Sequence, residues 1–285
     1  MSSEILHDTT PSHESPAKVA RSGRNSAIYL IGAIARNTFR EAVRDRVLYN
    51  LLLFALLLIG GAIFLGELSG GQEAKIIVDL GLSATLLFGV FIAIFVGVGL
   101  VYKEIEKRTL YAILSKPVSR GQFLFGKYVG LCLTLLVNVL VMGTGVSLAL
   151  AYVAKGWHPL IVAIWPATFL IYFELALITG VALLFSSFSS PALSALLTFL
   201  VFIIGHLSAD LKAFASSLGG VNARWFFNAL YYLLPNLSHY SFITAAAHGD
   251  LPTATTFLLA VAYAFVYIAV LLSAATLIFN QRNFK

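Results

Sequence analysis

The sequence predicts an all-α integral membrane protein with six transmembrane helices, an N-terminal interfacial amphipathic helix and a short cytoplasmic helix between spans two and three. Three observations carry this prediction: the composition, the apolar runs and the distribution of basic residues. Of the 285 residues, 59% are apolar and 11% are charged, whereas a soluble domain has roughly 25% charged residues. A globule of this length cannot bury so much apolar surface, so the composition excludes a water-soluble fold.

Six apolar runs predict the spans, because about 20 apolar residues in a helix cross the hydrocarbon core of a bilayer. The runs lie at about 48–66, 80–101, 124–153, 160–185, 191–207 and 253–279. An even number of spans places both termini on the same side of the membrane. That side carries 15 of the 19 Lys and Arg residues, and the positive-inside rule therefore predicts cytoplasmic termini.

The residues before the first span divide into a tail and a helix. Residues 1–25 are polar and predict a disordered tail, which leaves 26–285 for the six-span domain. From Ser26 to Arg46 the pattern has a helical period. Its apolar stripe comprises Ile28, Ile31, Ala35, Phe39 and Ala42, and its basic face comprises Arg36, Arg40 and Arg44. Such a helix lies in the inner headgroup layer; the alternative is a solvated basic helix, whose apolar stripe would have no partner.

The cytoplasmic loop between spans two and three contains a short amphipathic helix. Thr109 can cap its N-terminus, and Pro117 ends it. The apolar patch of this helix comprises Leu110, Ile113 and Leu114. Ser119 and Gln122 then form the S-x-x-Q capping box that starts the third span. A rigid helix with one apolar face suits a groove on a soluble partner; the alternative is a connector that lies on the bilayer.

The loop at 208–252 is long and partly apolar, on the side opposite the termini. Its stretch Asn222–Leu234 is rich in aromatic residues but would rise only about 20 Å as a helix, too little to cross the hydrocarbon. An interfacial or re-entrant helix that Pro235 ends is the prediction, with its aromatic side chains in the outer membrane interface. The alternative is that these side chains line a substrate exit.

Two strings resemble nucleotide-binding motifs, and their context excludes both. GQFLFGKY at 121–128 has a Tyr where the phosphate loop needs a Ser or Thr hydroxyl, and no predicted strand precedes it. LSGGQ at 68–72 matches the signature of ABC ATPases but lies in a short outer loop, where two glycines favour a turn. Hydrolytic motifs such as HExxH and GxSxG are absent, so the sequence predicts no catalytic residue in this chain.

Metal binding is not predicted either. The single cysteine, Cys132, excludes an internal disulfide and a cysteine-based metal site. A copper or zinc site built from His158, His206, His239 and His248 in the outer regions is left open as an alternative.

Glu174 is the acidic residue near the middle of the fourth span. A charged, unpaired carboxylate there costs roughly 2.5–3.5 kcal/mol on insertion scales, so it needs compensation. Asn138 in the third span is the expected hydrogen-bond partner. Two roles remain open for Glu174: a structural hydrogen bond within the bundle, or a place on a wet transport path at a dimer axis.

The segment Lys103–Gly130 resembles the corresponding loop in permease subunits of type-2 ABC transporters, and the likeness extends from about Asn25 onward. Most of this resemblance lies in the string KEIEKRTLYAILSKP at 103–117. The strings DLGL at Asp79–Leu82 and SSFSSP at Ser186–Pro191 add to it. Within this class the chain is most similar to the permeases that accompany copper-enzyme maturation and gliding-motility ATPases.

The resemblance implies a membrane permease that exports a substrate, powered by a separate ATPase. In this class the loop between spans two and three is the coupling helix on the ATPase, and two permeases pair with two ATPases. The expected ATPase-interface residues are Glu104, Glu106, Arg108, Thr109, Leu110, Ile113, Leu114 and Pro117 in the loop, with Arg36, Arg40 and Arg44 on the entry helix. ATP and Mg would bind the ATPase, which leaves this chain without a cofactor. The expected location is the bacterial inner membrane, where the class also allows a periplasmic or extracellular accessory protein.

Two functions of other classes compete with this expectation. A membrane scaffold that anchors an ATPase without transport would share the coupling helix. A proton-coupled secondary carrier centred on Glu174 would work without ATP, but it leaves the coupling loop unexplained.

Overall fold

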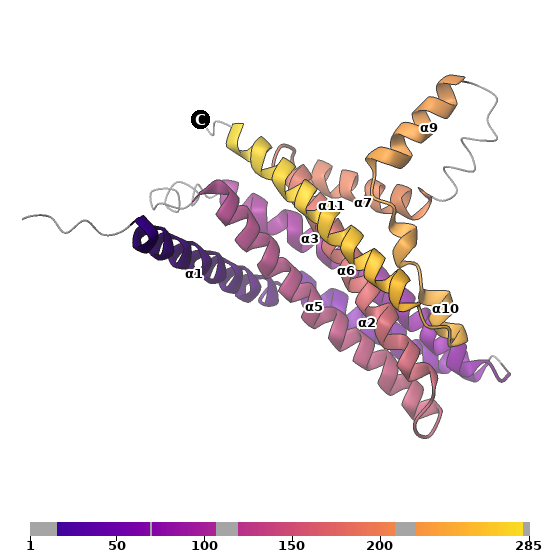
Figure 1. The fold of residues 1–285 in the computed structure, drawn as a ribbon. Helices are drawn as coiled ribbons and strands as arrows, with labels where there is room; N and C mark the ends of the chain where they lie inside the picture. The colour runs from indigo at the N-terminus through magenta and orange to yellow at the C-terminus, as the bar shows by residue number, and fades with distance from the viewer. Residues whose placement is uncertain (1–15, 69, 107–118, 209–220, 282–285) are drawn as a thin grey trace, which may run out of the picture.

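The structure is a computed structural model that describes residues 16–68, 70–106, 119–208 and 221–281. Within these ranges every element is a helix, and no strand occurs (Figure 1). The helices are α1 (Pro16–Val43), α2 (Arg46–Glu67), α3 (Glu73–Glu106), α5 (Arg120–Val153), α6 (Leu160–Ser186), α7 (Pro191–His206), α9 (Val221–Leu233), η1 (Leu237–Tyr240), α10 (Ile243–His248) and α11 (Ala254–Gln281).

Five helices in the described ranges are long and apolar enough to cross a membrane: α2, α3, α5, α6 and α11. The predicted span at about 191–207 forms α7, an apolar helix of 16 residues. At 1.5 Å per residue, α7 is about 24 Å long, shorter than the roughly 30 Å of hydrocarbon in a bilayer. The all-helical membrane class is confirmed, with five of the six predicted spans long enough to cross.

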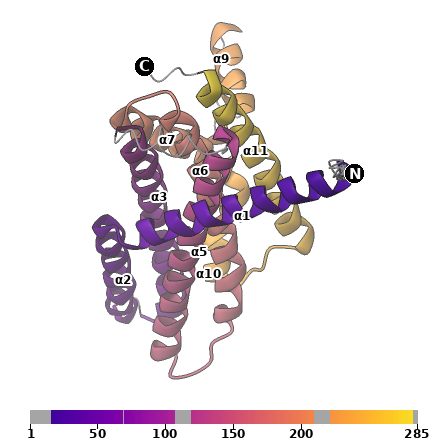
Figure 2. The same ribbon diagram turned by 90° about the vertical axis from the view of Figure 1, so that its left-hand side faces the viewer.

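The spanning helices run between two ends of the bundle (Figures 1 and 2). One end holds α1, the start of α5 and the end of α11. The turns that join α2 to α3 and α5 to α6 lie at the opposite end. This alternation agrees with the predicted grouping of the loops, in which the chain around residue 120 and the C-terminal segment share one side.

Helix α6 forms the centre of the bundle, where it contacts α3, α5, α7, α10 and α11. Its side chains are buried around most of its circumference; Leu170, Leu177 and Ala182 are fully buried. The sequence explains this position, because α6 is apolar on every face. In contrast, α2 and α11 keep exposed apolar side chains such as Leu57 and Phe265, which is typical of a surface that faces lipid.

Helix α1 crosses α5 at a steep angle (Figure 2). It begins at Pro16, ten residues before the predicted start at Ser26. Residues 16–25, predicted as part of a disordered tail, are therefore helical. Asp45 ends this segment and caps α2, accepting a hydrogen bond of 3.0 Å from the backbone of Val47.

The side chains of α1 divide between two environments. Ala35, Thr38 and Ala42 are buried, whereas Ile28, at the start of the predicted apolar stripe, is 64% exposed. The predicted basic face, consisting of Arg36, Arg40 and Arg44, is exposed.

Helix α9 projects away from the other helices (Figure 1), and its bounds match the predicted aromatic stretch closely. Trp225 and Tyr232 are largely exposed on it. Its C-terminal end is attached to the bundle, because the Tyr267 hydroxyl donates a hydrogen bond of 2.8 Å to the backbone carbonyl of Leu233.

Candidate functional site

Most of the predicted ATPase-interface residues lie outside the described ranges. These are Arg108, Thr109, Leu110, Ile113, Leu114 and Pro117. Glu104 and Glu106 belong to the last turn of α3, of which only the backbone is described. The structure therefore defines the two helix ends that flank the predicted coupling segment, and the basic face of α1 nearby.

The start of α5 has the predicted capping box. The Ser119 hydroxyl accepts a hydrogen bond of 3.3 Å from the backbone N–H of Gln122, and the Gln122 side chain accepts one of 3.2 Å from the backbone N–H of Ser119. Two backbone donors at the helix end are thus satisfied reciprocally. The capping box gives α5 a well-defined first turn directly after residue 118.

Arg120, the first residue of α5, connects this helix to the end of α11. Its guanidinium donates a hydrogen bond of 2.7 Å to the backbone carbonyl of Phe279. A cation at this position interacts favourably with the negative end of the α11 dipole and satisfies one of its last carbonyls. The start of α5 and the end of α11, 159 residues apart in sequence, are therefore joined directly.

Lys127, two turns further along α5, connects this helix to α1. Its ammonium group lies 3.7 Å from a carboxylate oxygen of Glu41, and the Lys127 side chain is only 1% exposed. The ammonium also lies over the ring of Phe123, 5.9 Å from its centroid. A buried cation needs such partners, because desolvation of an unpaired charge is costly. This pair therefore holds α1 against α5 from within the helix contact.

Three helices are tied together at the end that flanks the predicted coupling segment. Arg120, in the first turn of α5, holds α11, and Lys127, two turns later, holds α1. Sequence reasoning missed both contacts. The signal for Lys127 was present, because a basic residue inside the apolar run 124–153 requires a partner.

A second candidate site lies at the centre of the bundle, where the Glu174 carboxylate is 1% exposed. One of its oxygens lies 3.4 Å from Nδ1 of His206, the last residue of α7. His206 also packs against the ring of Phe202, with centroids 4.8 Å apart. The sequence predicts an outer position for His206 and gives no sign that it is the partner of Glu174.

The expected hydrogen bond between Asn138 and Glu174 does not appear among the described contacts. Asn138 instead donates a hydrogen bond of 2.8 Å to the backbone carbonyl of Thr134, one turn earlier in its own helix. An amide in an apolar helix can satisfy itself this way without a partner from another helix. The described residues contain no group of three His, Cys, Asp or Glu side chains close enough to hold a metal ion.

The two nucleotide-like strings have structural roles in helices and turns. Residues 121–128 lie within α5, where Lys127 faces Glu41. In the LSGGQ string, Gly70 and Gly71 both have positive φ values, 63° and 110°, in the turn between α2 and α3. Glycine adopts this conformation without steric cost, which explains the residue type by turn geometry.

The comparisons with known proteins place the chain among ABC transporters. A family model described as "ABC-2 family transporter protein" matches residues 32–284. The chain is 35% identical over 128 residues to "Probable ABC transporter permease protein NosY" of Stutzerimonas stutzeri, and 35% identical over 130 residues to the protein of the same name from Pseudomonas aeruginosa.

These two alignments cover 43% and 44% of this chain and 46% of each relative, so the chain matches less than half the length of these relatives. The family model, in contrast, extends over nearly the whole chain. With its membrane-spanning helices, the chain is a transport component and a multi-pass membrane protein. The protein therefore belongs to the ABC-2 family of transporter proteins, as a membrane subunit of an ABC transporter.

Proposed function

We propose that this chain is the permease subunit that couples a separate ATPase to the export of a substrate. The observation that carries the proposal is the connection of α1, α5 and α11 at the helix end beside residues 107–118. A movement of that segment would reach α5 through its capped first turn and then act on two further helices. No catalytic residue is needed in this chain for such a role.

In the proposed mechanism, residues 107–118 form the coupling helix seated on the ATPase. Arg36, Arg40 and Arg44 of α1 are exposed, and in this mechanism they would lie beside the same partner on the cytoplasmic side. Closure of the ATPase dimer on ATP and Mg would push the first turn of α5. Two copies of the chain would then alternate between inward-facing and outward-facing arrangements.

The proposed orientation has both termini in the cytoplasm of a bacterial cell. It is supported by the excess of basic residues on that side. Cysteine labelling in whole cells tests it, in a background where Cys132 is replaced by Ser. A membrane-impermeant maleimide should label Asp250→Cys from outside and leave Arg40→Cys unlabelled until the cells are opened. The reverse pattern would overturn the orientation.

Capture of the ATPase tests the coupling role. The tagged chain, co-expressed with the ATPase encoded beside it, should bring that ATPase down from detergent extracts. The double substitution Leu110→Asp and Leu114→Asp should abolish capture, because it places charges on the predicted apolar contact. The matched control, Leu251→Asp at an exposed site in the opposite loop, should retain it. Absence of ATPase from the wild-type preparation, or equal capture by both variants, would refute the proposal.

A proton-coupled carrier is the second candidate function, and the contact between Glu174 and His206 favours it. Two titratable groups that meet inside an apolar bundle are a common arrangement in proton pathways. Transport by this route would continue in vesicles without ATP and would stop when the proton gradient is removed. Transport that requires ATP and ignores the gradient would exclude the carrier and leave Glu174 with a structural role.

A further inference from the structure

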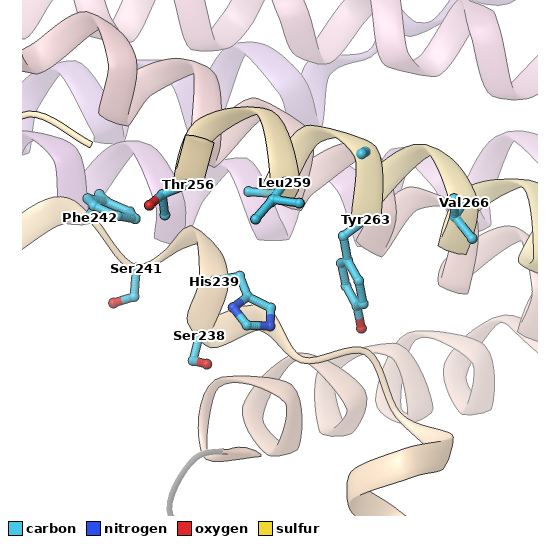
Figure 3. A pocket seen from close by; sticks show the side chains of 10 residues that line it. Ser238, His239, Ser241, Phe242, Thr256, Leu259, Tyr263 and Val266 are labelled. Carbon is cyan, nitrogen blue, oxygen red and sulfur yellow. The ribbon is translucent and has the colours of Figure 1, made fainter. Parts of the chain in front are cut away.

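A cavity of about 780 Å³ lies between α11 and the segment that contains η1 (Figure 3). It is separate from the cytoplasmic helix connections and from the Glu174–His206 contact. Its lining comprises Ser238, His239, Ser241, Phe242, Thr256, Leu259, Ala260, Ala262, Tyr263 and Val266. Its size is within the range of about 300–1,000 Å³ found for small-molecule sites.

The lining is divided by polarity. Hydroxyl groups and the imidazole of His239 lie toward the η1 side and the beginning of α11, where Thr256 adds a further hydroxyl. Further along α11 the lining is apolar at Leu259, Ala262 and Val266. Tyr263 adds one hydroxyl there, which accepts a hydrogen bond from the backbone N–H of Asn236. A site with a polar end and an apolar channel matches an amphiphile rather than a polar solute.

The length of the channel matches one leaflet of a bilayer. The α11 residues of the lining extend from Thr256, in the first turn, to Val266. Ten residues of helix rise about 15 Å, which is half of the roughly 30 Å hydrocarbon core. The polar end therefore lies near the membrane interface, and the apolar end lies near the bilayer centre.

The cavity is open to the surface that faces lipid. Leu259 is 64% exposed and Val266 is 67% exposed, on a helix that is long and apolar enough to cross the membrane. An acyl chain can therefore enter sideways from the bilayer, without passage through water.

The walls of the cavity are held in place by hydrogen bonds. The Tyr240 hydroxyl donates to the backbone carbonyl of Ala260 at 2.9 Å, and the Tyr263 hydroxyl accepts from the backbone N–H of Asn236 at 2.9 Å. Burial raises the pKa of the Tyr240 phenol above its ordinary range, so this donor stays protonated. The rings of His239 and Tyr263 pack edge to face, with centroids 5.7 Å apart. A site fixed in this way is formed before its ligand arrives, which lowers the entropic cost of binding.

We propose that this cavity binds one phospholipid from the leaflet at the N-terminal end of α11. One acyl chain lies along Leu259, Ala262 and Val266. The phosphate-bearing headgroup lies at the polar end, where Ser241 and His239 supply hydrogen-bond donors; the Ser238 hydroxyl donates to the Asn236 side chain instead. This binding site is independent of ATPase coupling and would exist in the isolated chain.

Photocrosslinking tests the site. The purified full-length chain is reconstituted into phosphatidylethanolamine vesicles that contain a phosphatidylethanolamine with a diazirine in one acyl chain. Labelled peptides are then mapped by mass spectrometry at increasing probe content. Labelling of residues 259–266 should saturate, whereas labelling at Val270, an exposed residue further along α11 that does not line this cavity, should rise in proportion to the probe.

Two substitutions on adjacent residues provide the matched comparison. Leu259→Trp fills the cavity and should remove the saturable labelling. Leu258→Trp should leave it unchanged, because Leu258 is equally exposed at 65% but does not line the cavity. Ala262→Leu serves as a second filling variant, and gel filtration of each variant reports its folding.

Competition by unlabelled lipids tests whether the headgroup is bound. Unlabelled phosphatidylethanolamine should compete with the probe for the saturable site, whereas diacylglycerol, which lacks the phosphate, should compete weakly. The variant His239→Ala with Ser241→Ala should remove this difference. Free inorganic phosphate should not compete.

Three results would overturn the proposal. The first is labelling of residues 259–266 that rises in proportion to the probe, as for ordinary boundary lipid. The second is equal loss of labelling in Leu258→Trp and Leu259→Trp. The third is a loss of self-association in Leu259→Trp, which would show that a second copy of the chain covers this face.

Discussion

Glu174 and His206 illustrate how a polar residue is accommodated in an apolar bundle. The carboxylate is almost fully buried, and the imidazole, which is 27% exposed, lies 3.4 Å from it. A buried pair of this kind is weak evidence for net stability, because desolvation offsets the attraction. Removal of one partner is nevertheless costly, since the other group is left in an apolar environment. The contact also links the middle of α6 to the end of α7, the helix that is too short to cross by itself.

This coupling predicts a specific pattern in a double-mutant cycle. His206→Ala should lower the free energy of unfolding by about 1–3 kcal/mol, because the Glu174 carboxyl loses its partner. Glu174→Gln should reduce the effect of the histidine substitution, since a neutral amide needs less compensation. The cycle should return a coupling energy of about 0.5–3 kcal/mol in equilibrium unfolding in mixed micelles.

The control for this cycle is His248→Ala. His248 is exposed, and its ring contacts only a carbonyl of its own helix among the described hydrogen bonds, so its substitution should change stability by less than about 0.5 kcal/mol. Strict additivity of the Glu174 and His206 substitutions would show that the two groups do not interact.

The contact between α1 and α5 depends on two glycines four residues apart in α5. A Cβ atom at Gly130 would lie 2.6 Å from the backbone carbonyl oxygen of Ala35, and one at Gly126 would lie 2.8 Å from the Ile34 side chain. Small residues at this spacing let helix backbones approach closely. The close contact also brings Glu41 within reach of Lys127.

Substitution of Gly130 should therefore separate α1 from α5. Gly130→Ala places a methyl group against backbone atoms, which cannot yield as a flexible side chain would, and should destabilise the protein by about 1–3 kcal/mol. Limited proteolysis should show faster trypsin cleavage at Arg36 and Arg40 as α1 detaches.

Gly60→Ala in α2 is the matched control. A Cβ atom there would meet nothing within 4 Å, so this variant should be neutral or more stable by up to about 1 kcal/mol. Equal trypsin sensitivity of the Gly130→Ala and Gly60→Ala proteins would contradict the packing account.

At the level of the whole molecule, the connections among α1, α5 and α11 allow the proposed docking on the ATPase to be separated from the proposed transmission of its movement. In the proposed mechanism, docking on the ATPase depends on residues 107–118 and the basic face of α1. Transmission depends on contacts within the chain, above all the hydrogen bond from Arg120 to Phe279. The two functions can therefore be separated by mutation.

Arg120→Ala should impair transmission without loss of docking. The variant should still capture the ATPase. Its ATP-dependent shift from the inward-facing to the outward-facing arrangement should be reduced, because α11 no longer follows α5. Hydrogen exchange should increase at residues 277–281, where the last carbonyls of α11 lose their donor.

Lys75→Ala, an exposed basic residue at the opposite end of α3, is the control and should change neither measurement. Unaltered exchange at the end of α11 in Arg120→Ala would show that this hydrogen bond does not hold the helix end.

The local pattern of the sequence was sufficient for most of the secondary structure. Apolar runs located the five long spans, Ser119 and Gln122 located the start of α5, and the aromatic stretch before Pro235 located α9. These features depend on neighbouring residues along the chain, through hydrogen bonding within a helix and hydrophobic periodicity. Hydropathy alone does not measure the length of an ordered helix, and the predicted span at 191–207 proved to be only 16 residues long.

The all-helical membrane class and most helix boundaries could thus be argued from residue type and spacing, and the kind of transporter from the family resemblance of the segment at 103–130. The partners of the few polar groups in the bundle could not. His206 meets Glu174, Lys127 meets Glu41, and Arg120 meets the carbonyl of Phe279 only because packing brings distant segments together. The cavity beside Tyr263 likewise exists only between segments that the fold juxtaposes. Burial of charge demands a partner, but the packing geometry of the helices decides which residue that partner is.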